Sequence, residues 1–273
     1  MKRPRMSALK PIGVFDSGLG GLTIVREMQR RLPAESIVYF GDMARLPYGT
    51  KSKEQILTYS IQNTLFLLKH KVKAVVVACN SSSSAAYTFL KNHFNLPIID
   101  VIEPAVESAL AATRTRRIGV IATQATVDSG AYQKGLQKKD PKVKVFQSAC
   151  PLFVPLVEEG WLSGKVTREV AAVYLKPLLA QKMDVLILGC THYPLLRQAI
   201  QAVVGKKIKL VDSIAPTVEQ LTAVLRKKEM AHPQNGRKSS LKIYVSDSPR
   251  NFVRVGEKFL GRKLDYVEVV RQK

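Results

Sequence analysis

Hydrophobic and polar positions follow two different patterns along the chain. Continuous apolar runs, several of them rich in β-branched residues, predict buried strands at 12–15, 37–40, 74–78, 98–99 and 241–245. Apolar residues that recur every three or four positions predict helices at 22–32, 56–70, 81–94, 128–136, about 166–179 and 252–260. A polar stretch predicts a surface loop at 229–240, and alternation predicts an edge strand at 265–270. Apolar strands separated by helices are typical of an α/β fold with mainly parallel sheets covered on both faces.

Three landmarks recur in the same order in the second half of the chain. The run at 12–14 returns at 118–120, the strand before Cys79 returns before Cys190, and the segment 100–106 returns at 212–218, at offsets of 106, 111 and 112 residues. An ordered repeat of this kind indicates two similar α/β lobes related by internal pseudo-symmetry. Each lobe would carry one cysteine at the carboxyl end of a strand.

Composition narrows the class of protein. The chain has 273 residues, of which 46% are hydrophobic, so it is expected to bury a core rather than to be disordered or fibrous. No apolar run approaches the roughly 18 residues that a membrane-spanning helix needs, and no apolar segment follows the basic start as in a secretory signal. Three widely spaced cysteines argue against a disulfide framework. A reducing, cytoplasmic location without membrane attachment is therefore expected.

The net charge of +22 leaves two interpretations open. It could mark a basic protein that associates with nucleic acid, or a solvated basic surface. Lys and Arg are spread over the termini and connections, and 226–273 alone holds 13 basic and 5 acidic residues. Because no basic stripe is interleaved with aromatic residues and no zinc-finger spacing is present, the solvated surface is favoured and no nucleic-acid partner is expected.

Polar and nucleophilic residues follow the predicted strands, where ligands of open parallel sheets bind. These candidates are Asp16, Ser17, Cys79, Asn80, Thr123, Cys190, Thr191 and His192. If Cys79 and Cys190 flank one carbon, one thiol can remove a proton while the other returns one to the opposite face, as an amino-acid racemase requires. A helix that begins directly after each cysteine would favour the thiolate and would also attract a substrate carboxylate.

Other interpretations of these residues are simpler. A lone buried cysteine is usually a small hydrophobic residue, and Cys150, which has no counterpart in the repeat, is assigned that role. The glycines at 18–21 match neither a Walker A loop nor a dinucleotide fingerprint. No cysteine–histidine pair has familiar zinc spacing, so no metal is expected.

Six motifs together make the chain resemble the glutamate racemase family. They lie at 14–22, 39–42, 45–52, 78–81, 150–160 and 188–194. The resemblance implies a cofactor-independent racemase that supplies D-glutamate for peptidoglycan. It implies that Cys79 takes the proton from D-glutamate and that Cys190 takes it from L-glutamate.

The resemblance also assigns supporting residues. Asp16 would assist Cys79, while Glu158 and His192 would assist Cys190. The implied substrate-binding residues are Asp16, Ser17, Tyr48, Gly49, Asn80, Ser81, Thr123, Thr191 and His192. Ser81 departs from the threonine usual in the family, which keeps the hydroxyl but removes a methyl group worth about 0.8 kcal/mol if buried.

The same resemblance implies interleaved lobes with the active site between them. The first lobe would contain 1–102 and 212–273, and the second 103–211. The partner is expected to be a small-molecule substrate, L- or D-glutamate, and a homodimer is expected as the assembly. An aspartate or hydantoin racemase of the same superfamily is the alternative enzyme, although the segments 47–49 and 190–194 favour glutamate.

Overall fold

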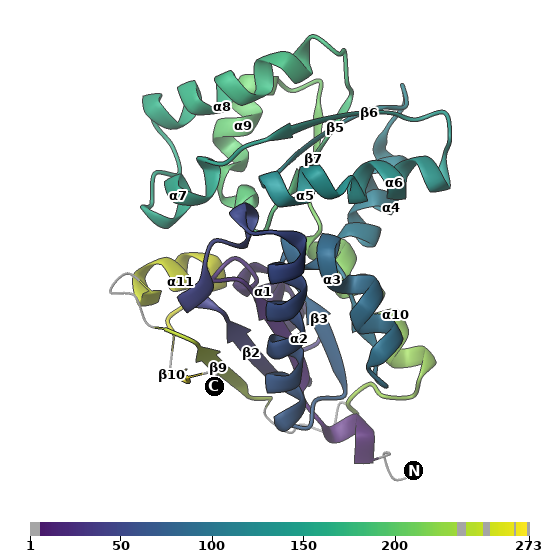
Figure 1. Cartoon of the computed structure of the whole chain (residues 1–273), viewed down its shortest axis with the longest axis vertical. Coiled ribbons are helices and arrows are strands. Elements are labelled where there is room, and N and C mark those ends of the chain that lie inside the picture. The colour runs from purple at the N-terminus through teal and green to yellow at the C-terminus, as the bar shows by residue number, and fades with distance from the viewer. Residues whose placement is uncertain (1–5, 234–238, 248–251, 265, 272–273) are drawn as a thin grey trace. The chain divides into compact units, whose positions relative to one another are not determined.

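A computed structural model describes residues 6–233, 239–247, 252–264 and 266–271. The chain forms two compact units, each built on a parallel β-sheet flanked by helices (Figure 1). The first unit consists of Met1–Val101 and Ile214–Lys273, and the second of Ile102–Ser213. The predicted α/β class with parallel sheets is confirmed.

The first unit contains a six-stranded sheet in the order β10-β9-β2-β1-β3-β4. Its strands are β1 (Ile12–Asp16), β2 (Ile37–Gly41), β3 (Ala74–Val77), β4 (Ile98–Ile99), β9 (Leu241–Val245) and β10 (Val267–Val269). Its α-helices are α1 (Leu22–Arg31), α2 (Lys53–Lys69), α3 (Asn80–His93), α10 (Ile214–Lys227) and α11 (Phe252–Leu260). Short 3-10 turns are η1 (Met6–Leu9), η2 (Met43–Arg45) and η3 (Tyr48–Thr50).

The central strands of this sheet are buried at every position, which explains their continuous apolar sequences. Alternate side chains from neighbouring strands, such as Phe15 and Val75, pack against Leu67 of α2 and Leu90 of α3. Helix α1 packs beside α10 and α11. The first unit is therefore completed by residues from both ends of the chain.

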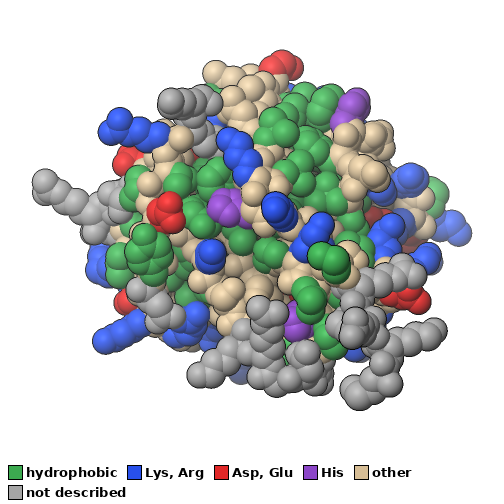
Figure 2. Space-filling model, turned by 90° about the horizontal axis from the view of Figure 1, so that it is seen from below, with side chains coloured by type: hydrophobic (Ala, Val, Ile, Leu, Met, Phe, Trp, Pro, Cys, Tyr) green, Lys and Arg blue, Asp and Glu red, His purple; other side chains and the backbone are tan. Residues whose placement is uncertain are grey.

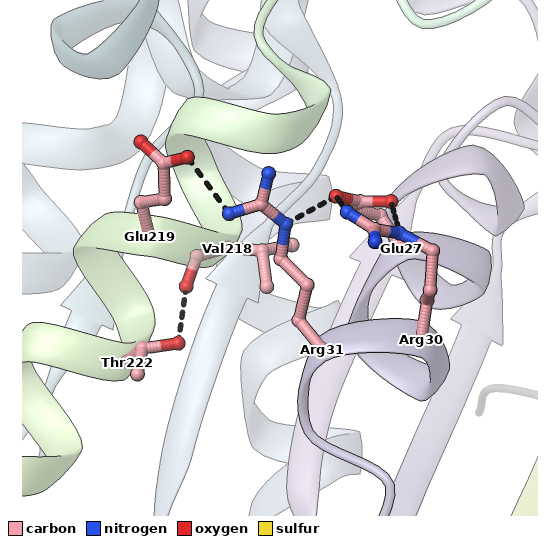
Figure 3. Close-up of polar contacts among 6 residues, drawn as sticks. All are labelled: Glu27, Arg30, Arg31, Val218, Glu219 and Thr222. Carbon is pink, nitrogen blue, oxygen red and sulfur yellow. Dashed lines mark hydrogen bonds and ion pairs between the residues drawn. The ribbon is translucent and has the colours of Figure 1, made fainter.

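An ion pair joins helix α10 to α1 (Figure 3). Arg31 of α1 lies between Glu27 and Glu219, and its Nη1 is 2.7 Å from Glu219 Oε1. Hydrogen bonds from Arg30, reinforced by Arg31, lower the pKa of Glu27 to about 2 despite the opposing effect of burial. Glu27 therefore stays ionised beside both guanidinium groups at neutral pH.

The second unit has a four-stranded sheet in the order β6-β5-β7-β8. Its strands are β5 (Arg117–Ala122), β6 (Lys144–Ala149), β7 (Val185–Gly189) and β8 (Lys209–Val211). Its helices are α4 (Ile102–Ala112), α5 (Gln124–Ser129), α6 (Ala131–Lys139), α7 (Phe153–Glu158), α8 (Lys165–Leu179) and α9 (Arg197–Val204), with the 3-10 turn η4 (Tyr193–Leu196). Helices α4 and α6 form a hydrophobic core with this sheet, in which Val106 and Leu136 pack against Val120 and Ile187.

Some details differ from the sequence-based expectations. The single helix predicted at 128–136 is wrong, because Gly130 adopts the left-handed conformation (φ 64°) and separates α5 from α6. Strand β6 was not predicted. Within the predicted loop at 229–240, residues 234–238 lie outside the described residues, and so does residue 265 of the predicted edge strand, of which β10 is the described part.

The surface agrees with a dispersed positive charge. Lys and Arg side chains lie at many separate points of the face in Figure 2, with hydrophobic and other side chains between them. Among the described residues, we find no helix that combines the length and the apolar character needed to cross a membrane.

Candidate functional site

In the first unit, the predicted site residues lie at the carboxyl ends of two neighbouring strands. Strands β1 and β3 are parallel partners, with Phe15 opposite Val77. Asp16 ends β1, and Cys79 follows β3 after one intervening residue. This register brings the Asp16–Ser17 step and Cys79 to the same edge of the sheet.

Cys79 occupies the N-cap position of α3, so the helix predicted after this cysteine is confirmed. Its thiol is buried and donates to Ser17 Oγ across 3.5 Å. Asn80 and Ser81 fall in the first turn of α3 and are also buried. The N-terminus of a helix presents backbone N–H groups and a positive dipole end, and both stabilise negative charge near the sulfur.

Asp16 is fully buried beneath the loop that leads into α1. Its Oδ2 accepts the Gly21 N–H at 3.0 Å. The same loop is held by Tyr39, whose hydroxyl donates to the Gly18 carbonyl at 2.7 Å. Burial raises the pKa of Tyr39 well above its usual value, and nearby Asp16 and Cys79 reinforce the effect, so the phenol stays neutral and keeps donating. Sequence reasoning assigned no role to Tyr39.

Tyr48 and Gly49 lie in η3, which packs against α3. Both residues are buried. The Tyr48 hydroxyl donates to Asp42 and accepts from Asn63 Nδ2 at 3.1 Å. The Tyr48 hydroxyl is thus engaged with two other side chains of the first unit.

In the second unit, the predicted residues again follow adjacent strands. Strands β5 and β7 are parallel partners, with Ala122 opposite Gly189. Thr123 follows β5 and caps α5, because its Oγ1 accepts the Thr126 N–H at 3.4 Å. Cys190 follows β7 and is buried, as is Thr191 beside it.

A chain of three side chains extends from the second cysteine. Cys190 Sγ is 3.8 Å from His192 Nδ1, and His192 Nε2 is 3.3 Å from Glu158 Oε1 at the end of α7. Burial by itself lowers the pKa of His192. The hydrogen bonds to Cys190 and Glu158 outweigh it and raise the pKa to about 10. At neutral pH the imidazole is therefore protonated and donates toward both the sulfur and the carboxylate.

The helix expected directly after Cys190 is wrong in its type. The N–H groups of Tyr193 and Leu195 bond to the carbonyls of Cys190 and His192, three residues earlier, so the chain makes the 3-10 turn η4. Helix α9 begins only at Arg197. The two cysteines therefore differ, because Cys79 caps an α-helix whereas Cys190 has a charged histidine beside it.

Aromatic side chains hold this arrangement together. The Tyr193 ring packs edge-on against Phe153 at the start of α7, with centroids 5.1 Å apart. The Tyr193 hydroxyl donates to the Cys150 carbonyl at 3.0 Å. Because α7 ends in Glu158, these contacts fix Glu158 close to His192. Sequence reasoning assigned no role to Tyr193 or Phe153, because their ring contact and the hydrogen bond from Tyr193 join segments that are far apart in the sequence.

Chemically, Cys79 in the first unit and Cys190 in the second are buried thiols beside polar side chains that can influence their charge. Within the described ranges, no three His, Cys, Asp or Glu side chains are gathered as a metal site would require. Cys150 is a different kind of thiol, since burial raises its pKa far above the usual value. Cys79 and Cys190 are therefore the candidate acid–base residues.

The chain is similar to known proteins in both sequence and structure. A family model described as Asp/Glu/Hydantoin racemase matches residues 12–221. The chain is 48% identical over 262 residues to the glutamate racemase of Neisseria meningitidis serogroup A, with 96% of each protein covered. It is 46% identical over 263 residues to the glutamate racemase of Syntrophus aciditrophicus, covering 96% of this chain and 97% of that one. A crystal structure of glutamate racemase from Francisella tularensis in complex with D-glutamate has a TM-score of 0.91 at 39% identity, covering 96% and 98% of the two chains.

Proposed function

Because the chain belongs to the Asp/Glu/Hydantoin racemase family of isomerases, we propose that it interconverts L-glutamate and D-glutamate through two cysteines and without a cofactor. The observation that carries the mechanism is that each unit has a buried cysteine after a parallel strand, Cys79 after β3 and Cys190 after β7, and that each cysteine has its own polar partner. The relatives named above support glutamate as the substrate. The product D-glutamate would serve peptidoglycan synthesis.

In the proposed reaction from L- to D-glutamate, the Cys190 thiolate removes the proton from the α-carbon. Cys79, as a thiol, then returns a proton to the opposite face of the same carbon. The reverse reaction exchanges the two roles. The enzyme must therefore hold one thiolate and one thiol at a time, and the protonated His192, 3.8 Å from Cys190 Sγ, favours the thiolate there.

The surrounding groups suit an amino-acid substrate. The first turn of α3, with Asn80 and Ser81, is suited to a carboxylate because a helix N-terminus attracts anions. The carboxylate of Asp16 is suited to attract the substrate ammonium group. Ser17, Thr123 and Thr191 complete the proposed contacts, together with the main chain at Tyr48 and Gly49. Ser81 is buried, and its hydroxyl would donate a hydrogen bond to the substrate carboxylate.

The decisive experiment follows the α-proton. Purified protein, with no pyridoxal phosphate or metal added, is incubated with L-glutamate or D-glutamate in D₂O, and both racemisation and deuterium at the α-carbon are measured. We expect deuterium in the product and complete loss of racemisation in Cys79→Ala and in Cys190→Ala.

Cys150→Ala is the matched control, since this thiol is buried but has no proposed part in the reaction. Activity close to wild type is expected for it. Racemisation at full rate in either Cys79→Ala or Cys190→Ala would eliminate the two-base mechanism.

The alternative enzymes are an aspartate racemase and a hydantoin racemase of the same family. The same assay with L-aspartate and with a 5-substituted hydantoin decides between them, and we expect the highest kcat/KM for glutamate. The cytoplasmic location and the homodimer stay predictions. Light scattering on the purified protein tests the second.

A further inference from the structure

A buried carboxylate lies beneath the turn that contains Tyr48 and Gly49. Asp42 follows β2 directly and has no solvent exposure. Its Oδ2 accepts the Tyr48 hydroxyl and lies 2.7 Å from Arg45 Nε, while its Oδ1 accepts the Ser246 hydroxyl at 2.8 Å. Three donors from separate segments thus converge on one carboxylate.

These contacts fix the turn rather than leaving Asp42 available for chemistry. The Arg45 guanidinium compensates the buried charge, as a buried carboxylate requires. Tyr48 is held from two sides, because its hydroxyl donates to Asp42 and accepts from Asn63 on α2. Burial raises the pKa of Tyr48 and the negative charge of Asp42 adds to it, so the phenol remains a donor.

Ser246 brings the C-terminal part of the chain into the same network. It follows β9, which pairs in parallel with β2 so that Val245 lies opposite Gly41. The Ser246 N–H bonds to the Gly41 carbonyl at 3.1 Å, and its hydroxyl accepts the Ala44 N–H at 2.9 Å while donating to Asp42. Ser246 therefore connects the end of β9, the middle of η2 and the buried carboxylate.

We propose that Asp42 is a positioning residue that holds the main chain of the Tyr48–Gly49 turn where it binds substrate, and that Ser246 makes this placement depend on the returning strand β9. The inference rests on the proposed function, in which this turn contacts the substrate. Because the turn would bind the substrate rather than exchange its α-proton, loosening it should weaken binding more than turnover.

The test uses full-length Asp42→Asn and Ser246→Ala and measures KM and kcat for both glutamate enantiomers. Asp42→Asn removes the negative charge on which Arg45, Tyr48 and Ser246 converge, so KM should rise about tenfold or more. Ser246→Ala removes a neutral hydroxyl and should raise KM about threefold. In both variants kcat should stay within about threefold of wild type, and Ser246→Thr, which keeps the hydroxyl, should restore KM.

Ser36→Ala is the matched control, because Ser36 Oγ accepts the Ser240 N–H at 3.2 Å and so links the opposite ends of β2 and β9. It should leave KM unchanged. An unchanged KM in Ser246→Ala, an equal rise in Ser36→Ala, or a loss confined to kcat would each overturn the proposal. If Asp42→Asn does not fold, the Ser246→Ala and Ser246→Thr pair decides alone.

The wild-type protein separates this result from a failure of the proposed function. If it racemises another amino acid in place of glutamate, the same KM comparison is made with that substrate.

Discussion

The link between Glu158 and His192 allows a quantitative prediction. In the wild type, Glu158 Oε1 is 3.3 Å from His192 Nε2. Glu158→Gln keeps the shape of the side chain and an oxygen near this nitrogen, but it removes the negative charge. The pKa of His192 is raised from 6.5 to about 10, against burial, by its hydrogen bonds to Cys190 and Glu158. Without the charge of Glu158, burial and the Cys190 contact remain.

The magnitude follows from the distance. An opposite charge within about 4–6 Å changes a pKa by about 1–3 units, so the pKa of His192 should fall from about 10 to about 7–9. Each unit corresponds to about 1.4 kcal/mol of preference for the protonated form. Between pH 8 and 9 the variant should then lose the imidazolium that supports the Cys190 thiolate. Its kcat/KM for L-glutamate should decline at lower pH than that of the wild type.

The pKa is measured directly by an NMR titration of the imidazole nitrogens, which is practical because the chain has only 4 histidines. Glu159→Gln is the matched control, since Glu159 is the neighbouring carboxylate and is exposed. Glu159→Gln should leave the pKa of His192 unchanged. A His192 pKa that stays near 10 in Glu158→Gln would refute the reasoning from charge and distance.

Glu158→Gln should also alter how the stability of the folded protein depends on pH. Because the pKa of His192 in the folded protein lies above 6.5, its protonation stabilises the folded state fully below pH 6.5. This contribution is lost as the pH rises through about 10. The stability advantage of the wild type over Glu158→Gln should therefore be largest near pH 6 and should shrink toward pH 10, as thermal melts across this range can show.

Three further predictions concern residues outside the cysteine pair. In Gly41→Ala, the new Cβ would lie 2.6 Å from the backbone oxygen of Gly18, so the loop after β1 must move. The kcat/KM should fall at least about tenfold, and urea unfolding should show a loss of about 1–3 kcal/mol of stability. Lys73→Met removes the cation from a fully buried pair with Glu35 and should lower the free energy of unfolding by about 3–5 kcal/mol. Adding Glu35→Gln to this variant should restore part of the loss. Cys150, with its raised pKa and full burial, should resist alkylation in the native protein and react only after unfolding, as mass spectrometry can show; rapid labelling of the native thiol would contradict its placement.

Sequence patterns predicted the parts of the fold that are buried on both sides. Strand β3 is apolar throughout and β1 is apolar up to Phe15, because helices cover both faces of the sheet, and a continuous apolar run indicates such burial directly. Strand β6 is only partly buried and includes Lys144, Gln147 and Ser148, so it has no such run. The break at Gly130 was missed because a glycine inside a helical pattern is compatible with either continuation or a cap.

The candidate site shows the same division. Position at or just after the carboxyl end of a strand was enough to select Asp16, Cys79 and Cys190, since the carboxyl ends of parallel strands lie at one edge of the sheet. The support of Tyr48 by Asp42 and Ser246 could not be predicted, because Asp42 and Ser246 are 204 residues apart in sequence and meet only through the pairing of β2 with β9. Long-range hydrogen bonds of this kind leave no local pattern.

The interrupted first unit has a consequence for synthesis on the ribosome. Strand β2 emerges early, but its neighbour β9 is made only after the whole of Ile102–Ser213 has been translated. The inserted unit can therefore fold first, while the edge of β2 awaits its partner with unpaired backbone groups. The nascent chain would need protection from aggregation during that interval, and a stop codon before β9 would leave the emerging sheet permanently incomplete.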